Sequence, residues 1–179
     1  MLITLIGYRG TGKTTIAPRL AQRLKFDWID ADIELERIAG RSIRDIFATD
    51  GEPEFRRLER ENLVRLLKRN RLVLATGGGA ILNDATRLDL RGAGPVVWLK
   101  ASVEAISKRI LVDGGAFANR PNLTTGGGID EIRTLVAQRE PLYQECATIS
   151  VPTDSLPIDS VVEQILNQLP ANYRQETNA

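Results

Sequence analysis

Residues 7–14, which read GYRGTGKT, carry the clearest chemical signal in this sequence. They fit the pattern G-x-x-x-x-G-K-[ST], in which a glycine-rich turn wraps backbone N–H groups around phosphate oxygens. Lys13 would bring a positive charge to the terminal phosphates, and the Thr14 hydroxyl is a hard oxygen ligand for Mg²⁺. An apolar run at residues 2–6 predicts a strand before the loop, and a helical pattern follows it, so a chance match is disfavoured. The loop predicts a nucleotide site and leaves the second substrate open.

Two carboxylates, Asp30 and Asp32, follow the next apolar segment at residues 26–29. Ligands of open α/β sheets bind at the carboxyl ends of the strands, which is where both residues are expected. One carboxylate there could hold Mg²⁺ through water, and the other could orient a substrate hydroxyl for attack. Asp is also favoured as a helix N-cap, so a purely structural role is the alternative for Asp32.

Arginines and glycines further along the chain could complete such a site. A guanidinium is a planar fork that suits a carboxylate or phosphate, and consecutive glycines let a ligand approach the backbone closely. Residues 113–128 are rich in Gly, Asn and Thr, which predicts a hinged lid whose arginine could close onto the phosphates. Each feature also has a purely structural alternative. The arginines could lie on solvated helix faces, the glycines could form a tight turn, and Arg139 could pair on the surface with Glu140 or Glu145. The residues concerned are Arg56, Gly77, Gly78, Gly79, Arg120 and Arg139.

The composition narrows the classes of function. The 179 residues carry a formal net charge of +1, which disfavours nucleic-acid binding through a broad basic face. The longest apolar runs fall short of the about 20 residues that a membrane span needs, and we expect a cytoplasmic protein, monomeric by default. The sequence has no histidine and one cysteine, Cys146, which we interpret as a buried apolar residue. Catalysis must then come from Asp, Glu, Lys, Arg, backbone N–H groups and an added metal.

Short apolar runs alternate with amphipathic segments, which predicts an α/β fold with a mostly parallel sheet and one domain at residues 1–170. Ser42 and Asp45 resemble a capping box, and Gly51 should break the helix that follows. Pro18 should bend the first helix if it lies beyond the first turn. Expected strands are 2–6, 26–29, 72–75, 96–99 and 147–151; expected helices after the first are 32–39, 53–69, 83–90, 102–111, 130–143 and 158–169, with a loose tail at 171–179.

Taken together, these motifs resemble the shikimate kinase family over residues 2–169. They are the P-loop, residues 29–32 (IDAD), 51–56 (GEPEFR), 77–80 (GGGA), 120–121 (RP) and 139–143 (REPLY), in the same order and at similar spacing. The resemblance implies ATP-dependent phosphorylation of the 3-hydroxyl of shikimate, in the pathway to chorismate and the aromatic amino acids. It also implies a P-loop NTPase fold like the nucleoside monophosphate kinases, a three-layer sandwich with a five-stranded parallel sheet in order 2-3-1-4-5. Residues 120–123 (RPNL) depart from the usual Arg-Pro-Leu-Leu of the family's lid.

The resemblance also implies a role for each matching residue. Lys13, Asp32 and Arg120 would be catalytic; Gly10, Thr11, Gly12, Lys13, Thr14, Thr15, Arg109, Arg120 and Pro157 would contact ATP; Asp32, Arg56, Gly77, Gly78, Gly79 and Arg139 would contact shikimate; Thr14 and Asp30 would serve Mg²⁺. Two other functions stay open at this point. One is a kinase of another small hydroxy acid such as gluconate, and the other is a non-catalytic nucleotide-binding regulator.

Overall fold

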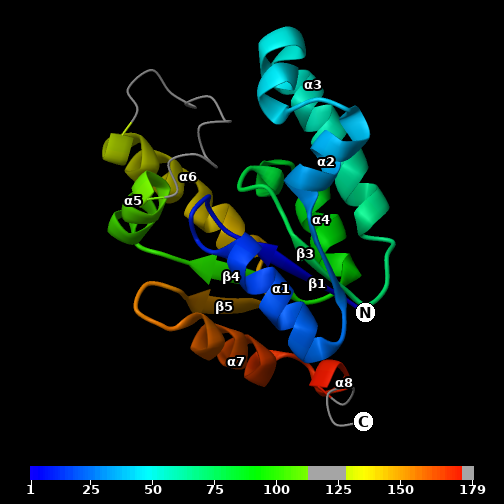
Figure 1. Cartoon of the computed structure of the whole chain (residues 1–179), viewed down its shortest axis with the longest axis vertical. Coiled ribbons are helices and arrows are strands. Elements are labelled where there is room, and N and C mark those ends of the chain that lie inside the picture. The colour runs from blue at the N-terminus through cyan, green and yellow to red at the C-terminus, as the bar shows by residue number, and fades with distance from the viewer. Residues whose placement is uncertain (113–127, 175–179) are drawn as a thin grey trace.

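A five-stranded parallel sheet forms the middle layer of the computed structural model, which describes residues 1–112 and 128–174 (Figure 1). Its order, β2-β3-β1-β4-β5, confirms the expected topology. The central strands are buried along their length, as in a sheet covered on both faces, and this explains their continuous apolar sequences. The strands are β1 (Leu2–Ile6), β2 (Asp27–Asp30), β3 (Leu72–Ala75), β4 (Val96–Lys100) and β5 (Ile149–Pro152).

Helices cover both faces of this sheet. One apolar core lies between the sheet and helices α1 and α7, and the opposite face packs against α3, α4 and α6. Figure 1 shows this three-layer arrangement, with α7 beside α1 and next to β5. The helices are α1 (Lys13–Leu24), α2 (Ala31–Ala39), α3 (Ile43–Leu66), the 3-10 turn η1 (Ala80–Leu82), α4 (Asp84–Ala93), α5 (Val103–Val112), α6 (Gly128–Cys146), α7 (Ile158–Gln168) and α8 (Ala171–Arg174).

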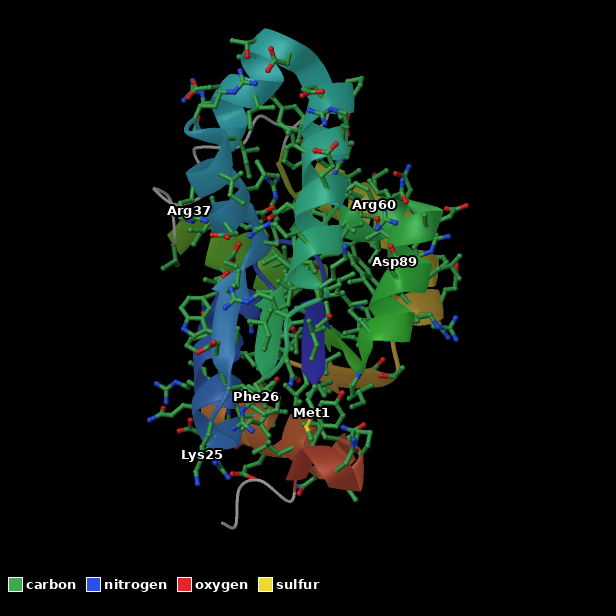
Figure 2. All side chains as sticks on the ribbon, turned by 90° about the vertical axis from the view of Figure 1, so that its right-hand side faces the viewer. Met1, Lys25, Phe26, Arg37, Arg60 and Asp89 are labelled. Atoms are coloured by element: carbon green, nitrogen blue, oxygen red, sulfur yellow. The ribbon has the colours of Figure 1, made fainter. Side chains whose placement is uncertain are left out.

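Helix α2 and the first part of α3 form an arm that extends beyond the sheet (Figure 1). The arm has its own small core, separate from the sheet. The predicted capping box of Ser42 and Asp45 starts α3, and Gly51 has φ +80° and ψ 176°, which confirms the expected break. Further along α3, Arg60 pairs with Asp89 of α4 and ties the long helix to its neighbour, as Figure 2 shows. This ion pair links the helix that carries the arm to α4.

The end of the described chain corrects one expectation. Residues 171–174 are not a loose tail: they form helix α8, and Tyr173 is buried. Its hydroxyl lies 3.3 Å from the Leu2 carbonyl oxygen, to which it donates a hydrogen bond. Four residues are too few to give a periodic pattern, so the sequence offered no signal for this helix. Pro18 lies inside α1 beyond the first turn, and the bend expected there stays a prediction.

Along residues 1–112 and 128–174, no helix combines the length and the apolar character needed to cross a membrane.

Candidate active site

The P-loop joins β1 to α1, as the motif predicted. Gly10 and Gly12 have φ +77° and +96°, a conformation that glycine adopts without strain. The Lys13 ammonium is buried and donates to the carbonyl oxygens of Gly7 and Tyr8 at 2.7 and 2.9 Å. The lysine is thus held against the loop, with its charge at the start of α1, where anions bind.

A cleft of about 650 Å³ opens above this loop, within the size range of small-molecule sites. Arg109 crosses one end of it, where its Nη1 donates to the carbonyl oxygen of Gly10 at 3.2 Å and to Thr153 Oγ1 at 3.1 Å. Leu156 and Ile158 lie in the wall of the cleft. Pro157, between them, is not among the described residues that line it. Seven of the predicted nucleotide residues do line it: Gly10, Thr11, Gly12, Lys13, Thr14, Thr15 and Arg109. Arg120, the remaining one, lies outside the described residues.

The two residues predicted to serve Mg²⁺ touch each other at the edge of this cleft. Thr14 Oγ1 donates to Asp30 Oδ2 at 2.9 Å, while Asp30 Oδ1 accepts from the backbone N–H of Asp32 at 2.9 Å. Asp30 is therefore the N-cap of α2, and Asp32 lies in the first turn. In the part of the chain that the structure describes, no group of three or more His, Cys, Asp or Glu residues could hold a metal. The hydroxyl–carboxylate pair suits Mg²⁺, which takes few protein ligands and completes its shell with phosphate and water.

A second, smaller cavity adjoins the cleft at the foot of the α2–α3 arm. The two share Arg9, Ile43 and Gly78 in their walls, so a ligand in one would face a ligand in the other. The rings of Phe47 and Phe55, 4.7 Å apart, give the smaller cavity an apolar wall. Its charged lining residues are Arg9, Arg56, Glu59 and Arg139. We call it the acceptor cavity.

Arg56 enters the acceptor cavity from α3 already paired. Its Nη1 donates to Glu59 Oε2 at 2.7 Å, and its Nη2 donates to Glu52 Oε1 at 3.0 Å. Burial alone would lower the pKa of Arg56, but these two carboxylates raise it above its usual value. Glu59, whose side chain is only 9% exposed, was not among the predicted site residues. Its spacing of three residues from Arg56 is the only signal that could have found it, and such pairs are common on helix surfaces.

Arg139 enters the acceptor cavity from α6 without such a partner. It is buried, its Nη1 donates to the Gly78 carbonyl oxygen at 3.3 Å, and its guanidinium lies 5.6 Å from the centre of the Tyr8 ring. Tyr143, one helical turn along α6, donates its hydroxyl to the same carbonyl at 2.6 Å. Burial raises the pKa of Tyr143, so this hydroxyl keeps its proton. Gly78 thus holds two side chains of α6 through one oxygen.

The surface ion pairs weighed as an alternative for Arg139 are made elsewhere. Glu140 pairs with Lys100 at 3.7 Å, and Glu145 pairs with Arg87 at 3.2 Å. Within residues 1–112 and 128–174, no carboxylate forms an ion pair with Arg139. The guanidinium is therefore a buried cation whose described contacts include the Gly78 carbonyl and the Tyr8 ring.

The three glycines after β3 have a physical explanation in the side chains above them. A Cβ on Gly77 would lie 2.8 Å from Asp32 Oδ1 and 2.9 Å from Glu59 Oε1. A Cβ on Gly79 would lie 2.5 Å from Arg56 Nη1. The glycine segment is therefore the floor on which the charged residues of α2 and α3 rest. Arg120 and the predicted lid lie outside the described residues, apart from Gly128, which begins α6.

Comparison with known proteins agrees with this geometry. Residues 9–170 match the sequence model of the family described as shikimate kinase. A shikimate kinase of Thermobifida fusca is 42% identical over 95% of each chain. A solved shikimate kinase of Acinetobacter baumannii, in complex with shikimate, superposes with a TM-score of 0.86 at 38% identity, over 93% of this chain and 90% of that one. A gluconokinase of Sinorhizobium meliloti, with 93% of this chain and 89% of that one covered, reaches 0.54 at 16% identity and shares the fold alone. The chain therefore belongs to the shikimate kinase family.

Proposed function

We propose that this chain transfers the γ-phosphoryl group of ATP to the 3-hydroxyl of shikimate, giving ADP and shikimate 3-phosphate on the route to chorismate. The observation that carries the proposal is Arg139, a buried cation in a cavity that adjoins the P-loop cleft. A buried charge is costly without a counter-ion, and none of the described carboxylates pairs with this one. The carboxylate of a small hydroxy acid would supply it, and shikimate is bound to the Acinetobacter relative.

On the donor side, the P-loop would hold the phosphates of ATP. The backbone of Gly10, Thr11 and Gly12 faces the cleft, and Lys13 would shift from its two carbonyl acceptors to the phosphate oxygens. Thr15 would extend the phosphate contacts, while Arg109 and the segment around Pro157 would border the base. Thr14 and Asp30 would hold Mg²⁺, which when bound neutralises charge on the phosphates.

On the acceptor side, Asp32 would accept a hydrogen bond from the 3-hydroxyl and orient its oxygen toward the γ-phosphorus. The new oxygen–phosphorus bond forms as the bond to the β-phosphate oxygen breaks, and the hydroxyl proton leaves toward Asp32 or solvent. Arg56 and Arg139 would clamp the substrate carboxylate from two helices, above the floor of Gly77, Gly78 and Gly79. Arg120 is expected from the sequence to close onto the phosphates.

We further propose a cytoplasmic, monomeric enzyme in which residues 1–170 act as one domain. The two cavities adjoin each other and share Arg9, Ile43 and Gly78, which supports a single domain that carries both substrates. The free, buried thiol of Cys146 is compatible with a reducing compartment.

The test is an assay that couples ADP release to a measurable signal, with a panel of hydroxy acids. Shikimate should stimulate ADP release, whereas gluconate should not. The matched control is Lys13→Met, which should remove the stimulation and so exclude a contaminating kinase. Stimulation by gluconate in place of shikimate would assign the other kinase activity, and no stimulation by any acid would favour a non-catalytic regulator.

A further inference from the structure

Tyr8, the second residue of the P-loop motif, touches both halves of the site. Its backbone carbonyl oxygen accepts hydrogen bonds from Lys13 Nζ at 2.9 Å and from Thr11 Oγ1 at 2.8 Å, on the donor side. Its ring lies in the wall of the acceptor cavity, where the guanidinium of Arg139 is 5.6 Å from the ring centre. The backbone and the side chain of one residue therefore serve different substrates.

The Tyr8 ring is held firmly in this place. The residue is 3% exposed and packs in an apolar cluster with Ile106 of α5 and Ile132 of α6. The cation–π distance to Arg139 lies within the range of favourable contacts, and burial strengthens such contacts because water competes less. A fixed ring can therefore fix the plane of the guanidinium beside it.

Arg139 needs such support. Its described hydrogen bond, to Gly78, is long at 3.3 Å, and none of the carboxylates in the described ranges pairs with it. A guanidinium that is already oriented loses less freedom when it captures a carboxylate. We infer that Tyr8 is a positioning residue, whose ring presents Arg139 to the substrate carboxylate. The inference rests on the proposed function of Arg139 as part of the carboxylate clamp.

The hydroxyl of Tyr8 is not needed for this role. Its oxygen is buried and makes no hydrogen bond within the described part of the chain. The conservative variant Tyr8→Phe keeps the ring and removes only this group. It should therefore separate the aromatic contact from any polar contribution.

The experiment compares Tyr8→Phe with Tyr8→Leu, using calorimetry for shikimate affinity and steady-state kinetics for both substrates. Tyr8→Leu should weaken shikimate binding about tenfold, the loss expected for a buried cation–π contact. Its KM for ATP should stay near the wild-type value, because Lys13 bonds to a backbone carbonyl that any residue supplies. Tyr8→Phe should retain the shikimate affinity of the wild type. Tyr8→Met, which is also flexible and apolar, replaces Tyr8→Leu if that variant does not fold.

Measuring Tyr8→Leu in a protein that also carries Arg139→Met tests whether Tyr8 acts on shikimate binding through Arg139. If Tyr8 acts through Arg139, the tenfold loss of kcat/KM for shikimate caused by Tyr8→Leu should disappear in Arg139→Met. The same loss in both backgrounds, equal losses for ATP and shikimate, or an unchanged affinity in Tyr8→Leu would each overturn the inference. An unchanged shikimate affinity in Arg139→Met alone would instead refute the proposed clamp.

Discussion

Replacing each clamp arginine by methionine should separate their contributions to stability and to binding. Methionine keeps most of the aliphatic volume, so the main change is the loss of the guanidinium. Arg56→Met removes the 2.7 Å partner of Glu59, whose side chain is 9% exposed. Arg139→Met removes a buried cation with no described carboxylate partner. We therefore expect a loss of stability from the first variant and little from the second.

The magnitude follows from the burial of Glu59. Complete removal of one partner of a buried ion pair costs about 3–5 kcal/mol. Arg56 is 27% exposed, so water can partly replace it, and about 2 kcal/mol is the expected loss in the free energy of unfolding. For a chain of this size, that lowers the melting temperature by about 4–8 °C. Arg139→Met should stay within about 1 kcal/mol of wild type, because it exchanges a desolvated charge for apolar contact.

Thermal and urea unfolding, measured without ligand, provide the comparison. The double variant Arg56→Met with Glu59→Gln is the control, since removal of the Glu59 charge together with its Arg56 partner should recover most of the lost stability. Both single variants should raise the KM for shikimate about 10- to 100-fold through loss of charge-assisted hydrogen bonds. Equal destabilisation of the two single variants would refute the reasoning, as would wild-type stability in Arg56→Met.

Three further variants test other parts of the molecule. Lys13→Met should lower kcat by at least about 10²-fold, through loss of a donor to the transferring phosphate, in the ADP-release assay; near-normal turnover would contradict the assigned role. Gly79→Ala places a Cβ 2.5 Å from Arg56 Nη1 and should raise the KM for shikimate several-fold, whereas Gly92→Ala, with nothing within 4 Å of its Cβ, is the neutral control. Burial raises the pKa of Cys146 from 9.0 to about 11, so its contribution to stability against urea should be constant below pH 9 and fall between pH 9 and 11, as the unfolded thiol ionises first. That alkaline decline should be smaller in Cys146→Ala, in which the buried Tyr143 hydroxyl still contributes.

The parts of this site that are local in sequence could be predicted, and the parts that depend on distant neighbours could not. The P-loop specifies its own backbone path through its glycines, and the spacing of Arg139 and Tyr143 already places both on one helix face. Glu59 looks like an ordinary surface partner of Arg56 until β3 brings Gly77 against it. The strand order was predicted from the family resemblance alone, because apolar runs indicate where strands lie but not which strands are neighbours in the sheet.

Helix α8 and the N-cap of α2 also depend on features of the fold that the local sequence does not show. Tyr173 is buried because Leu2, at the other end of the chain, offers a carbonyl oxygen to its hydroxyl, and because its ring joins the apolar core between the sheet and helices α1 and α7. The N-cap role was the structural alternative for Asp32, whereas the backbone path makes Asp30 the cap. Residue preferences therefore indicate which residues could cap or form a helix, and tertiary contacts determine which of them do.

The acceptor cavity divides two physical requirements between its arginines. Two carboxylates neutralise Arg56 in advance, so it is held rigidly but can give less net attraction to an anion. No described carboxylate neutralises Arg139, so it offers a full charge but depends on Gly78 and the Tyr8 ring for its orientation. A site with two fully neutralised arginines would bind an acid weakly, and a site with two uncompensated ones would destabilise the fold. One arginine of each kind gives a cavity that is stable when empty and still attracts a monocarboxylate, which is why the loss of Arg56 should lower both stability and shikimate binding, whereas the loss of Arg139 should lower binding alone.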